Sequence, residues 1–445
     1  MNTVLGIVLV LGLMILVHEW GHFIVARMFG VRVDVFSIGF GPRLFGWKRG
    51  ATDYRISALP LGGYVRMAGQ DLSEIDSGEK APTGAPDEVM SKPRWQRALI
   101  SFAGPAVNLV MPLLLLGGFY FVKGYPYPAY LDSPVIFSDL LANGPLAKAG
   151  VSDGEKLVSV NGTQITDWRK AESSFAAISD DGNVKLIVSR NGVTREISVT
   201  AASLKGAEHP LGYPPAPPVI AAPSPGMPAK SAGLQKKDVV LAVNGVSIHN
   251  WFQCVDLIRA SGGNALNFKV QRGSEVRDFV VHPIQEKEEN SGQLVWRVGA
   301  GNETEWNFTK MSFATAVTTA SHETVQATKG LFGVLGKLFT GRLSVRQLQG
   351  FVGIAVRAGQ AVQSGPVDTV ELMGMISLNL GILNLLPIPI LDGGHILLLT
   401  IEGIRRKDLS LAFKERFIQV GFVFLLLLFA FVMYNDVRHL LPMHT

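Results

Sequence analysis

Three residues near the start of the chain, His18, Glu19 and His22, could bind a metal ion and move a proton. On a helix, residues four apart project from one face, so His18 and His22 can share a tetrahedral zinc ion. Glu19 lies beside them and is positioned to take a proton from a water molecule. The spacing predicts a catalytic zinc site; the alternative is that these polar side chains form hydrogen bonds between helices.

The surroundings of this motif strengthen the metal prediction, because residues 4–25 are almost entirely apolar. A stretch of this length and composition is typical of a helix that crosses a membrane. An ionisable side chain at the centre of a bilayer costs about 2.5 to 3.5 kcal/mol on insertion scales. Two histidines and a glutamate at that depth therefore need a compensating partner, and a bound cation such as Zn²⁺ would be one.

A catalytic zinc site usually has three protein ligands and one open position, so a third ligand is expected at the same depth. Asp392 is the favoured candidate, and His395 competes with it. Asp392 lies in residues 384–394, where two prolines and a glycine pair must interrupt a helix. Irregular backbone at membrane depth is tolerated only where protein or a water-filled cavity satisfies it, which is typical of a functional cavity.

Four apolar segments of the chain could cross a membrane. The chain has 445 residues, of which 47% are hydrophobic, and its mean hydropathy of +0.26 is high for a soluble protein. Each segment is close to the ~20 residues that a helix needs to span hydrocarbon. We expect the first segment to be retained, since no basic residue precedes it and cleavage as a signal peptide would remove the metal motif. We therefore predict a polytopic α-helical membrane protein with four transmembrane helices, at residues 1–27, 95–123, 370–404 and 413–436.

Basic residues predict how the chain crosses the membrane. Lys and Arg are concentrated in residues 28–94 and in the short loop 405–416, so both loops should be cytoplasmic. Residues 123–365 and both termini are then extracytoplasmic, and the metal motif lies toward the cytoplasmic side. The net charge of +5 reflects this topology, and no nucleic-acid partner is expected. Cys254 is the single cysteine, which excludes an intrachain disulfide and a thiolate zinc site.

The extracytoplasmic segment contains an internal repeat with an offset of 83 residues. Residues 160–162 and 243–245 both read Val-Asn-Gly, and Trp168 matches Trp251. A helix-like stretch and then a strand, a turn and a strand follow in each copy. This order resembles the PDZ domain, which adds an extended peptide to the edge of a sheet; the two copies could do this or could be steric or scaffolding modules. The predicted tandem PDZ-like α+β domains are residues 127–205 and 210–285.

Two further regions are predicted to associate with the membrane without spanning it. In residues 55–69, strand-like residues flank Gly62-Gly63, which predicts a β-hairpin with its turn at this pair. An edge strand there could hold an unwound substrate in extended form. Residues 305–369 contain a stretch of helical apolar spacing, which predicts either an interfacial helix or one packed on the protein itself. The candidate substrate-binding residues of the hairpin are Gly62, Gly63, Tyr64, Val65, Arg66 and Met67.

Two asparagines lie within the predicted spans, where a polar side chain needs a partner. Asn384 could hold the substrate backbone or a developing oxyanion, or it could serve helix packing. Asn108 is predicted to form a hydrogen bond between helices. Asn384 is therefore a further candidate substrate-binding residue, whereas Asn108 has a structural role in this prediction.

The zinc motif in the first span, the segment N-x-x-P-x-P-x-L-D-G-G in a later span and the paired PDZ-like domains together resemble the site-2 protease family of intramembrane zinc metalloproteases. The resemblance covers essentially the whole chain. It implies that His18, His22 and Asp392 hold Zn²⁺ and that Glu19 is the catalytic base. It also implies that residues 55–69 form a membrane-reentrant β-hairpin and that the protein lies in a bacterial inner membrane.

The predicted activity is hydrolysis of a peptide bond inside the transmembrane segment of a single-span membrane protein. By the resemblance, substrates would include a membrane-bound anti-sigma factor already shortened by another protease, with the PDZ pair excluding uncut forms, and also remnant signal peptides. The alternative is a non-enzymatic membrane adaptor or receptor that uses the PDZ pair, but a binding module has no need for a buried general base. A metal transporter is a third interpretation, which four spans and one metal site fit poorly.

Overall fold

The computed structural model describes residues 6–69, 83–138, 140, 143–179, 181–206, 211–224, 226–287, 293–340 and 350–440. The chain divides into two compact units. Unit 1 is formed by Met1–Tyr125 and Lys310–Thr445, and unit 2 is formed by Pro126–Thr309. Unit 1 contains the apolar helices and the predicted metal ligands, whereas unit 2 contains the sequence repeat.

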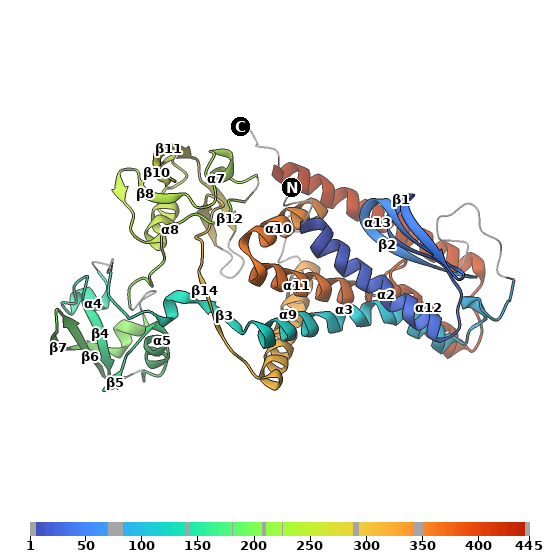
Figure 1. Cartoon of the computed structure of the whole chain (residues 1–445), viewed down its shortest axis with the longest axis horizontal. Helices are drawn as coiled ribbons and strands as arrows, with labels where there is room; N and C mark the ends of the chain where they lie inside the picture. Colours follow the sequence, from blue (N-terminus) through green and yellow to red (C-terminus); the bar gives the residue numbers. More distant parts are fainter. Residues whose placement is uncertain are drawn as a thin grey trace. The chain divides into compact units, whose positions relative to one another are not determined.

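Unit 1 is a bundle of apolar helices with a small β-sheet beside helix α2 (Figure 1). Among the described residues, four helices are long and apolar enough to cross a membrane: Val10–Met28, Arg94–Val122, Pro366–Asn384 and Ala412–Tyr434. The prediction of a polytopic membrane protein is therefore confirmed. The helices of unit 1 are the π-helix η1 (Ile7–Gly12), α2 (Leu13–Met28), η2 (Val89–Ser91), α3 (Arg94–Val122), α9 (Phe313–Phe339), α10 (Phe351–Ser364), α11 (Pro366–Asn384), α12 (Asp392–Arg405) and α13 (Leu411–Leu440).

Helix α3 packs against α2, α9, α11 and α12 and forms the centre of unit 1 (Figure 1). Glycines make the closest of these contacts. A Cβ atom added at Gly21 of α2 would lie 2.6 Å from the Ala103 carbonyl oxygen, and one at Gly381 of α11 would lie 3.0 Å from the Pro105 carbonyl oxygen. Lipid offers no hydrophobic driving force between helices, so close backbone approach at small residues stabilises their association. Helix α3 is thus the surface against which α2 and α11, two of the other spans, are fixed.

The segment between α11 and α12 is not helical, as its prolines predicted. Helix α11 ends at Asn384 and α12 begins at Asp392. A Cβ atom added at Gly393 or Gly394 would lie 2.3 Å from a carbonyl oxygen of this same segment, so only glycine fits there. Ile390 has a φ of +78°, which a β-branched residue rarely adopts and which costs on the order of 1–3 kcal/mol. The backbone is therefore strained immediately before Asp392.

The β-hairpin of unit 1 has its turn at a different place from the predicted one. Strand β1 (Val33–Arg49) pairs with the antiparallel strand β2 (Thr52–Met67), and the chain turns between them at Gly50. The predicted turn at Gly62-Gly63 is wrong, because both residues lie inside β2. Gly50 has a φ of +64°, the left-handed conformation that a tight turn requires and that glycine adopts without steric cost.

The start of β1 pairs with the end of β2, so this end of β2 is held on one side. Val33 lies opposite Met67, and Ile38 lies opposite Gly63. The second half of β1 pairs with the start of β2, and register shifts between the two regions bend both strands. Within the described part of the chain, β1 is the only strand that pairs with residues 63–67. These residues therefore form an edge of the sheet.

Helix α9 combines a packed side with exposed apolar side chains. It contacts α3 through a cluster of buried residues, Leu116, Tyr120, Ala316 and Ala320. The Tyr120 hydroxyl also donates a hydrogen bond of 2.5 Å to Glu323 Oε2. Other positions of α9 expose large apolar side chains, namely Phe313, Val317, Val325, Phe332 and Val334.

Unit 2 repeats one arrangement of helices and strands (Figure 1). The first sheet has the order β5-β4-β6-β7, and the second has the matching order β9-β8-β10-β11. The first copy consists of α4 (Pro145–Lys148), β4 (Lys156–Val160), β5 (Thr163–Gln164), α5 (Trp168–Ala176), β6 (Asn183–Arg190), β7 (Val193–Thr200) and α6 (Ala201–Lys205). The second consists of α7 (Pro228–Ser231), β8 (Val239–Val243), β9 (Val246–Ser247), α8 (Trp251–Arg259), β10 (Leu266–Arg272) and β11 (Glu275–Val281).

The remaining elements of unit 2 form short pairs outside the two four-stranded sheets. Strand β3 pairs with β14, and β12 pairs with β13. Their bounds, with that of the short helix η3, are β3 (Tyr125–Pro128), η3 (Ala129–Asp132), β12 (Ile284–Lys287), β13 (Leu294–Arg297) and β14 (Trp306–Thr309).

The Val-Asn-Gly segments form the same turn in both copies. Asn161 and Asn244 have φ values of +47° and +50°, a left-handed conformation that asparagine tolerates better than most residues. The Oδ1 atom of Asn161 accepts a hydrogen bond of 2.8 Å from the Lys185 backbone N–H, and Asn244 accepts one of 2.7 Å from Asn267. The sequence repeat therefore has a structural basis, because each asparagine joins its turn to the next long strand.

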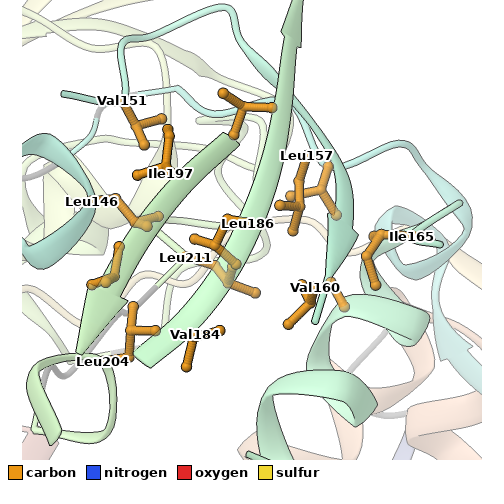
Figure 2. Packing of buried hydrophobic residues seen from close by; sticks show 14 of the residues in the cluster. Leu146, Val151, Leu157, Val160, Ile165, Val184, Leu186, Ile197, Leu204 and Leu211 are labelled. Carbon is orange, nitrogen blue, oxygen red and sulfur yellow. The ribbon is translucent and has the colours of Figure 1, made fainter. Parts of the chain in front are cut away.

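A buried apolar cluster holds the first copy together, and Figure 2 shows its side chains converging from the strands and the adjoining segments. The pattern of β6 explains the burial on one face, because every second residue from Val184 to Val188 is buried. The labelled members of the cluster are Leu146, Val151, Leu157, Val160, Ile165, Val184, Leu186, Ile197, Leu204 and Leu211.

Each copy also contains a buried carboxylate paired with an arginine. Glu155 Oε2 lies 2.7 Å from Arg195 Nη2, and Asp238 Oδ2 lies 2.6 Å from Arg272 Nη2. The Glu155 and Asp238 side chains are almost fully buried. Removing one partner of such a pair leaves a buried charge without compensation, which is strongly destabilising. In the first copy the pair joins the residue before β4 to β7, two strands away in the sheet, and in the second it joins the residue before β8 to the adjacent strand β10.

Substitution Glu155→Gln should reduce the sensitivity of unit 2 to acid. The hydrogen bond from Arg195 lowers the pKa of Glu155, so its contribution to stability is present above the usual pKa of about 4.5 and is lost as the pH falls through the lowered pKa. We expect the melting temperature of the wild-type protein in detergent to fall more than that of the variant between about pH 6 and about pH 3, as measured by circular dichroism.

The control for this experiment is Glu196→Gln. Glu196 pairs with Lys185 on the surface, where its side chain is 56% exposed, and such pairs contribute little to stability. This variant should keep the acid profile of the wild type. An unchanged profile in Glu155→Gln would contradict the prediction.

Candidate active site

The structure brings His18, His22 and Asp392 together inside unit 1. His18 and His22 lie one turn apart on α2, and Asp392 is the first residue of α12. His18 Nε2 lies 3.3 Å from Asp392 Oδ2, and His22 Nε2 lies 3.4 Å from Asp392 Oδ1. The two Nε2 atoms are 3.3 Å apart. Residues from opposite ends of the chain therefore form one group of three donor atoms.

The three separations fit a zinc ion. Zinc binds imidazole nitrogen and carboxylate oxygen at about 2.0–2.2 Å in tetrahedral geometry, so the corners of its coordination tetrahedron lie about 3.3–3.6 Å apart. The Nε2 atoms of His18 and His22 are 3.3 Å apart, which is the separation of two such corners. Each Nε2 atom lies 3.3 or 3.4 Å from a different oxygen of the Asp392 carboxylate, so one of these oxygens could take a third corner. In catalytic zinc sites the fourth corner is left for water or substrate.

The charges of the site also favour a divalent cation. His18 and His22 are 7% and 8% exposed, and Glu19 and Asp392 are partly buried. The two carboxylates place two negative charges inside an apolar bundle, where burial penalises each of them. A Zn²⁺ ion would compensate both charges, which a set of hydrogen bonds between neutral groups would not do.

Helix α3 orients His22. The Nδ1 atom of His22 lies 2.7 Å from the Ile100 carbonyl oxygen, so Nδ1–H is the donor and the lone pair of Nε2 is left for a metal. The imidazole also lies against Gly104, where an added Cβ atom would be 2.2 Å from His22 Nε2. Sequence analysis missed both residues, because nothing in the sequence places them beside His22.

Asn108 of α3 orients His18. Its Nδ2 atom lies 3.2 Å from His18 Nδ1, and its backbone oxygen accepts a hydrogen bond of 3.0 Å from Ser377 of α11. The predicted interhelical hydrogen bond is therefore present. If His18 Nε2 binds a metal, Nδ1 carries the proton and must donate it. The side-chain oxygen of Asn108 should then face His18 and accept this hydrogen bond. The oxygen and nitrogen of a side-chain amide have nearly the same shape, so the amide fits equally well in this flipped orientation.

Glu19 faces the edge of the β-sheet. A Cβ atom added at Gly63 would lie 3.1 Å from Glu19 Cγ, so a glycine leaves room for the carboxylate there. The backbone of Val65 lies within hydrogen-bonding reach of the same carboxylate. The free edge of β2 and the predicted general base are therefore neighbours.

A cavity of about 340 Å³ contains the three donor atoms. Asn384 lines it, and its Nδ2 atom lies 3.3 Å from His18 Nε2, directly beside the donor group. His395 also lines the cavity, but it is not one of the three clustered donors. Of the predicted substrate-binding residues of β2, Tyr64, Val65 and Met67 line the cavity, whereas Gly62, Gly63 and Arg66 do not.

The cavity extends beyond the residues that the sequence indicated. Its lining includes Arg97 and Ser101 of α3, Glu402 of α12 and Lys414 of α13. Arg97 lies near the start of the predicted span 95–123, and Glu402 and Lys414 lie on either side of the short loop between α12 and α13. Charged residues at the end of a span would be expected at the membrane surface, so no signal in the sequence connects them with the metal ligands.

A bundle of apolar helices that contains an HExxH segment and three clustered metal donors defines the class of membrane-embedded zinc metalloproteases. A family model described as Peptidase family M50 matches residues 6–428 of the chain. The chain is 32% identical to Protease RseP of Yersinia pestis, over 97% of this chain and 98% of that protein. It is 31% identical to Regulator of sigma-E protease RseP of Escherichia coli, with the same shares covered, and 30% identical to Zinc metalloprotease RasP of Geobacillus kaustophilus, over 98% of each chain.

The chain therefore belongs to peptidase family M50. This confirms the resemblance to the site-2 protease family that the motifs indicated. The protein is a zinc metalloprotease and a membrane protein, and Zn²⁺ is its cofactor.

Substitution Gly104→Ala should reduce the zinc content of the protein. The new Cβ atom would lie 2.2 Å from His22 Nε2, so either the imidazole or helix α3 must move, and the donor geometry is lost. Zinc bound per chain after purification, measured by atomic absorption, should fall well below the wild-type value.

The matched control is Gly118→Ala in the same helix. A Cβ atom at Gly118 meets no atom within 4 Å, and alanine favours a helix over glycine. This variant should bind zinc as the wild type does. Equal zinc content in Gly104→Ala would show that His22 does not need its observed position.

Proposed function

We propose that this protein hydrolyses peptide bonds within transmembrane segments of single-span membrane proteins. In this proposal His18, His22 and Asp392 hold Zn²⁺, and Glu19 is the general base. The observation that carries it is the group of two imidazole Nε2 atoms 3.3 Å apart, each within 3.4 Å of the Asp392 carboxylate, inside a bundle of helices long and apolar enough to span a membrane. Soluble substrates would have no route to a site at that depth, whereas a transmembrane segment already lies there.

The chemistry follows from the placement of Glu19. Bound zinc would supply a Lewis acid that acidifies water and polarises the scissile carbonyl group. Glu19 would take the proton from the attacking water and later deliver it to the leaving amine. His22, held by the Ile100 carbonyl, and His18, held by Asn108, keep their imidazoles fixed while the proton moves.

The edge of β2 would hold the substrate in extended form. The backbone groups of a transmembrane helix are bonded within the helix, so the helix must unwind before its peptide bond can be attacked. Residues 63–67 offer backbone donors and acceptors at a sheet edge, and an extended peptide can pair with such an edge. Because Glu19 lies beside Gly63 and Val65, a peptide paired there would place a backbone carbonyl near the base.

Asn384 would hold the substrate next to the zinc. Its side-chain amide lies 3.3 Å from His18 Nε2 and lines the cavity. An amide N–H at this position can donate to the substrate backbone or to the oxyanion that develops on the scissile carbonyl, a contribution that reaches 10² to 10³-fold in other enzymes.

The two repeated modules of unit 2 would select substrates by size or by sequence. Their matching sheets resemble PDZ domains, with a helix between the second and third strands of each copy. The relative from Escherichia coli is named as a regulator of sigma-E protease. We infer that substrates include a membrane-bound anti-sigma factor already shortened by another protease and remnant signal peptides, with the modules excluding uncut forms.

The basic loops and apolar surfaces support a bacterial inner-membrane location, with unit 2 and both termini extracytoplasmic. The β1–β2 hairpin exposes Leu44, Phe45 and Trp47, and aromatic side chains of this kind favour the membrane interface. The hairpin would then be membrane-reentrant, with its turn at Gly50. Helix α9 would lie at the interface through its exposed apolar side chains.

A second candidate is a non-enzymatic membrane adaptor or receptor that uses the modules of unit 2. The cavity disfavours it, because a binding module would not require three zinc-spaced donors beside a carboxylate. Measured hydrolysis separates the two candidates.

Substitution Glu19→Gln should abolish cleavage without removing zinc. Purified protein in detergent would be given a tagged single-span reporter that lacks its external domain. A missing general base typically lowers the rate 10²- to 10⁴-fold, whereas the three metal donors remain. Wild-type protein should cut within the span, and the variant should show no product at matched zinc content. Cutting by both proteins would mean that Glu19 is not the base, and cutting by neither would favour the adaptor.

Substitution Asn108→Ala should weaken zinc binding 10- to 100-fold, because the residue that orients a metal-binding histidine is lost. Competition with a fluorescent zinc chelator measures the affinity directly. The control is Val110→Ala, which changes an exposed residue of the same helix. An unchanged affinity in Asn108→Ala would indicate that Asn108 serves only helix association.

A further inference from the structure

The catalytic cavity has a second polar end, formed by residues for which the proposed chemistry has no use. Its lining includes Arg97 of α3, Glu402 of α12 and Lys414 of α13. These residues come from three helices, so the cluster exists only in the folded protein. Charged side chains buried within an apolar bundle are costly and are mostly found where they have a partner or a function.

Glu402 has one satisfied and one unsatisfied oxygen. Its side chain is fully buried. The Oε1 atom accepts hydrogen bonds of 2.9 Å from Lys414 Nζ and of 2.9 Å from the Leu409 backbone N–H. The Oε2 atom is buried and has no hydrogen-bond partner among the described residues, although Arg97 Nη2 lies 3.8 Å away. An acceptor is therefore left on the wall of the cavity.

Arg97 complements it with a donor. Its side chain is 11% exposed, and its Nη1 atom donates to the sulfur of Met90 at 3.4 Å, a weak acceptor. Its Nε atom is buried, and none of the described residues accepts its hydrogen bond. A buried polar group without a partner costs about 1–3 kcal/mol. Arg97 and Glu402 are neighbours, and both line the cavity. Their two unsatisfied atoms, Nε and Oε2, point to a polar group that binds there in the working protein.

The chemistry of that group is restricted. An ionised carboxylate has no hydrogen to donate to Glu402 Oε2, and an ammonium group has no lone pair to accept from Arg97 Nε. An apolar side chain would satisfy neither atom. An amide has both an N–H group for Glu402 Oε2 and a carbonyl oxygen for Arg97 Nε, and it carries no charge.

We propose that Arg97 and Glu402 form a subsite for an amide of the substrate, three to five residues from the scissile bond. The amide is the carboxamide side chain of an Asn or Gln residue of the substrate. The distance between the subsite and the scissile bond follows from the helices. Glu402 lies ten residues after Asp392, about 15 Å along α12. Arg97 lies one turn before Ile100, whose carbonyl oxygen holds His22. An extended chain advances about 3.3 Å per residue, so 10–15 Å corresponds to three to five residues. This inference rests on the proposed cleavage of transmembrane segments.

A scan of reporter segments tests the subsite. Single-span peptides with a leucine background would each carry one Gln, placed at successive positions up to eight residues on either side of the cleaved bond. Their dissociation constants would be measured in nanodiscs with the Glu19→Gln protein, which is expected not to turn them over. Gln three to five residues from the bond on one side should tighten binding about five- to tenfold relative to leucine, the gain of one or two satisfied hydrogen bonds.

Substitution Arg97→Lys should remove this preference, so that reporters with Gln and with leucine bind equally well. Lysine keeps the positive charge beside Glu402 but lacks the Nε donor and the planar fork of arginine. The matched control is Arg94→Lys, one turn earlier on α3, whose arginine pairs with Asp408 at 2.8 Å and does not line the cavity. This control should keep the preference for Gln.

Failure of the inference can be distinguished from failure of the proposed function. If the wild-type protein cuts the all-leucine reporter but no position of Gln tightens binding, the subsite is overturned and the protease remains. A preference for Gln that persists in Arg97→Lys would also overturn it. If the wild-type protein cuts no reporter at all, the proposed function itself fails and the subsite fails with it. The position scan uses no substitution at Arg97 or Glu402, so it holds even if those variants do not fold.

Discussion

The compensation of charged groups inside an apolar helix bundle is the constraint on which the rest of the structure depends. His18 and His22 are buried and two carboxylates are partly buried inside this bundle, and each of these groups would be costly there alone. In the proposed function a Zn²⁺ ion held by three of these groups would make their burial tolerable, and the two imidazoles and the Asp392 carboxylate lie close enough together to share one. The same requirement explains why Ile100 and Asn108 hold the far side of each imidazole, since a ligand that can rotate would lose its metal and leave a charge uncompensated.

Helix α3 meets this constraint by being the helix that all parts of the site contact. It packs on α2, which carries the histidines, and on α12, which begins with Asp392. Glycines bring these backbones so close that an added methyl group would clash with a carbonyl or with the ligand itself. Close backbone packing is a main source of stability between helices in lipid, and here it also sets the separation of the donor atoms. Stability of the bundle and precision of the site therefore have the same physical origin.

Two departures from regular structure make the site accessible to a substrate. The chain between α11 and α12 unwinds at its prolines, carries the strained Ile390 and presents Asp392 at a helix start. The end of β2 remains an unpaired edge next to Glu19, although free edges are usually protected because they bind other chains. In a protease that must hold an unwound segment, such an edge is useful. The polar end of the cavity at Arg97 and Glu402 would extend the same function, because a substrate with an Asn or Gln side chain has an amide to offer.

The sequence by itself determined the features that depend on local spacing. The four-residue interval of the histidines, the length of the apolar segments, the prolines before Asp392 and the Asn-Gly turns of the repeat all express local backbone geometry, and the structure has each of them. The tertiary structure decided what depends on distant contacts: Gly104 and Asn108 beside the histidines, Asp392 rather than His395 in the donor group, and Arg97 beside Glu402. It also placed the hairpin turn at Gly50 rather than at Gly62-Gly63, because the pairs that β1 forms with both ends of β2 outweigh a local glycine pair. Periodicity is a property of neighbouring residues, whereas the position of one helix against another is set by packing that no short segment contains.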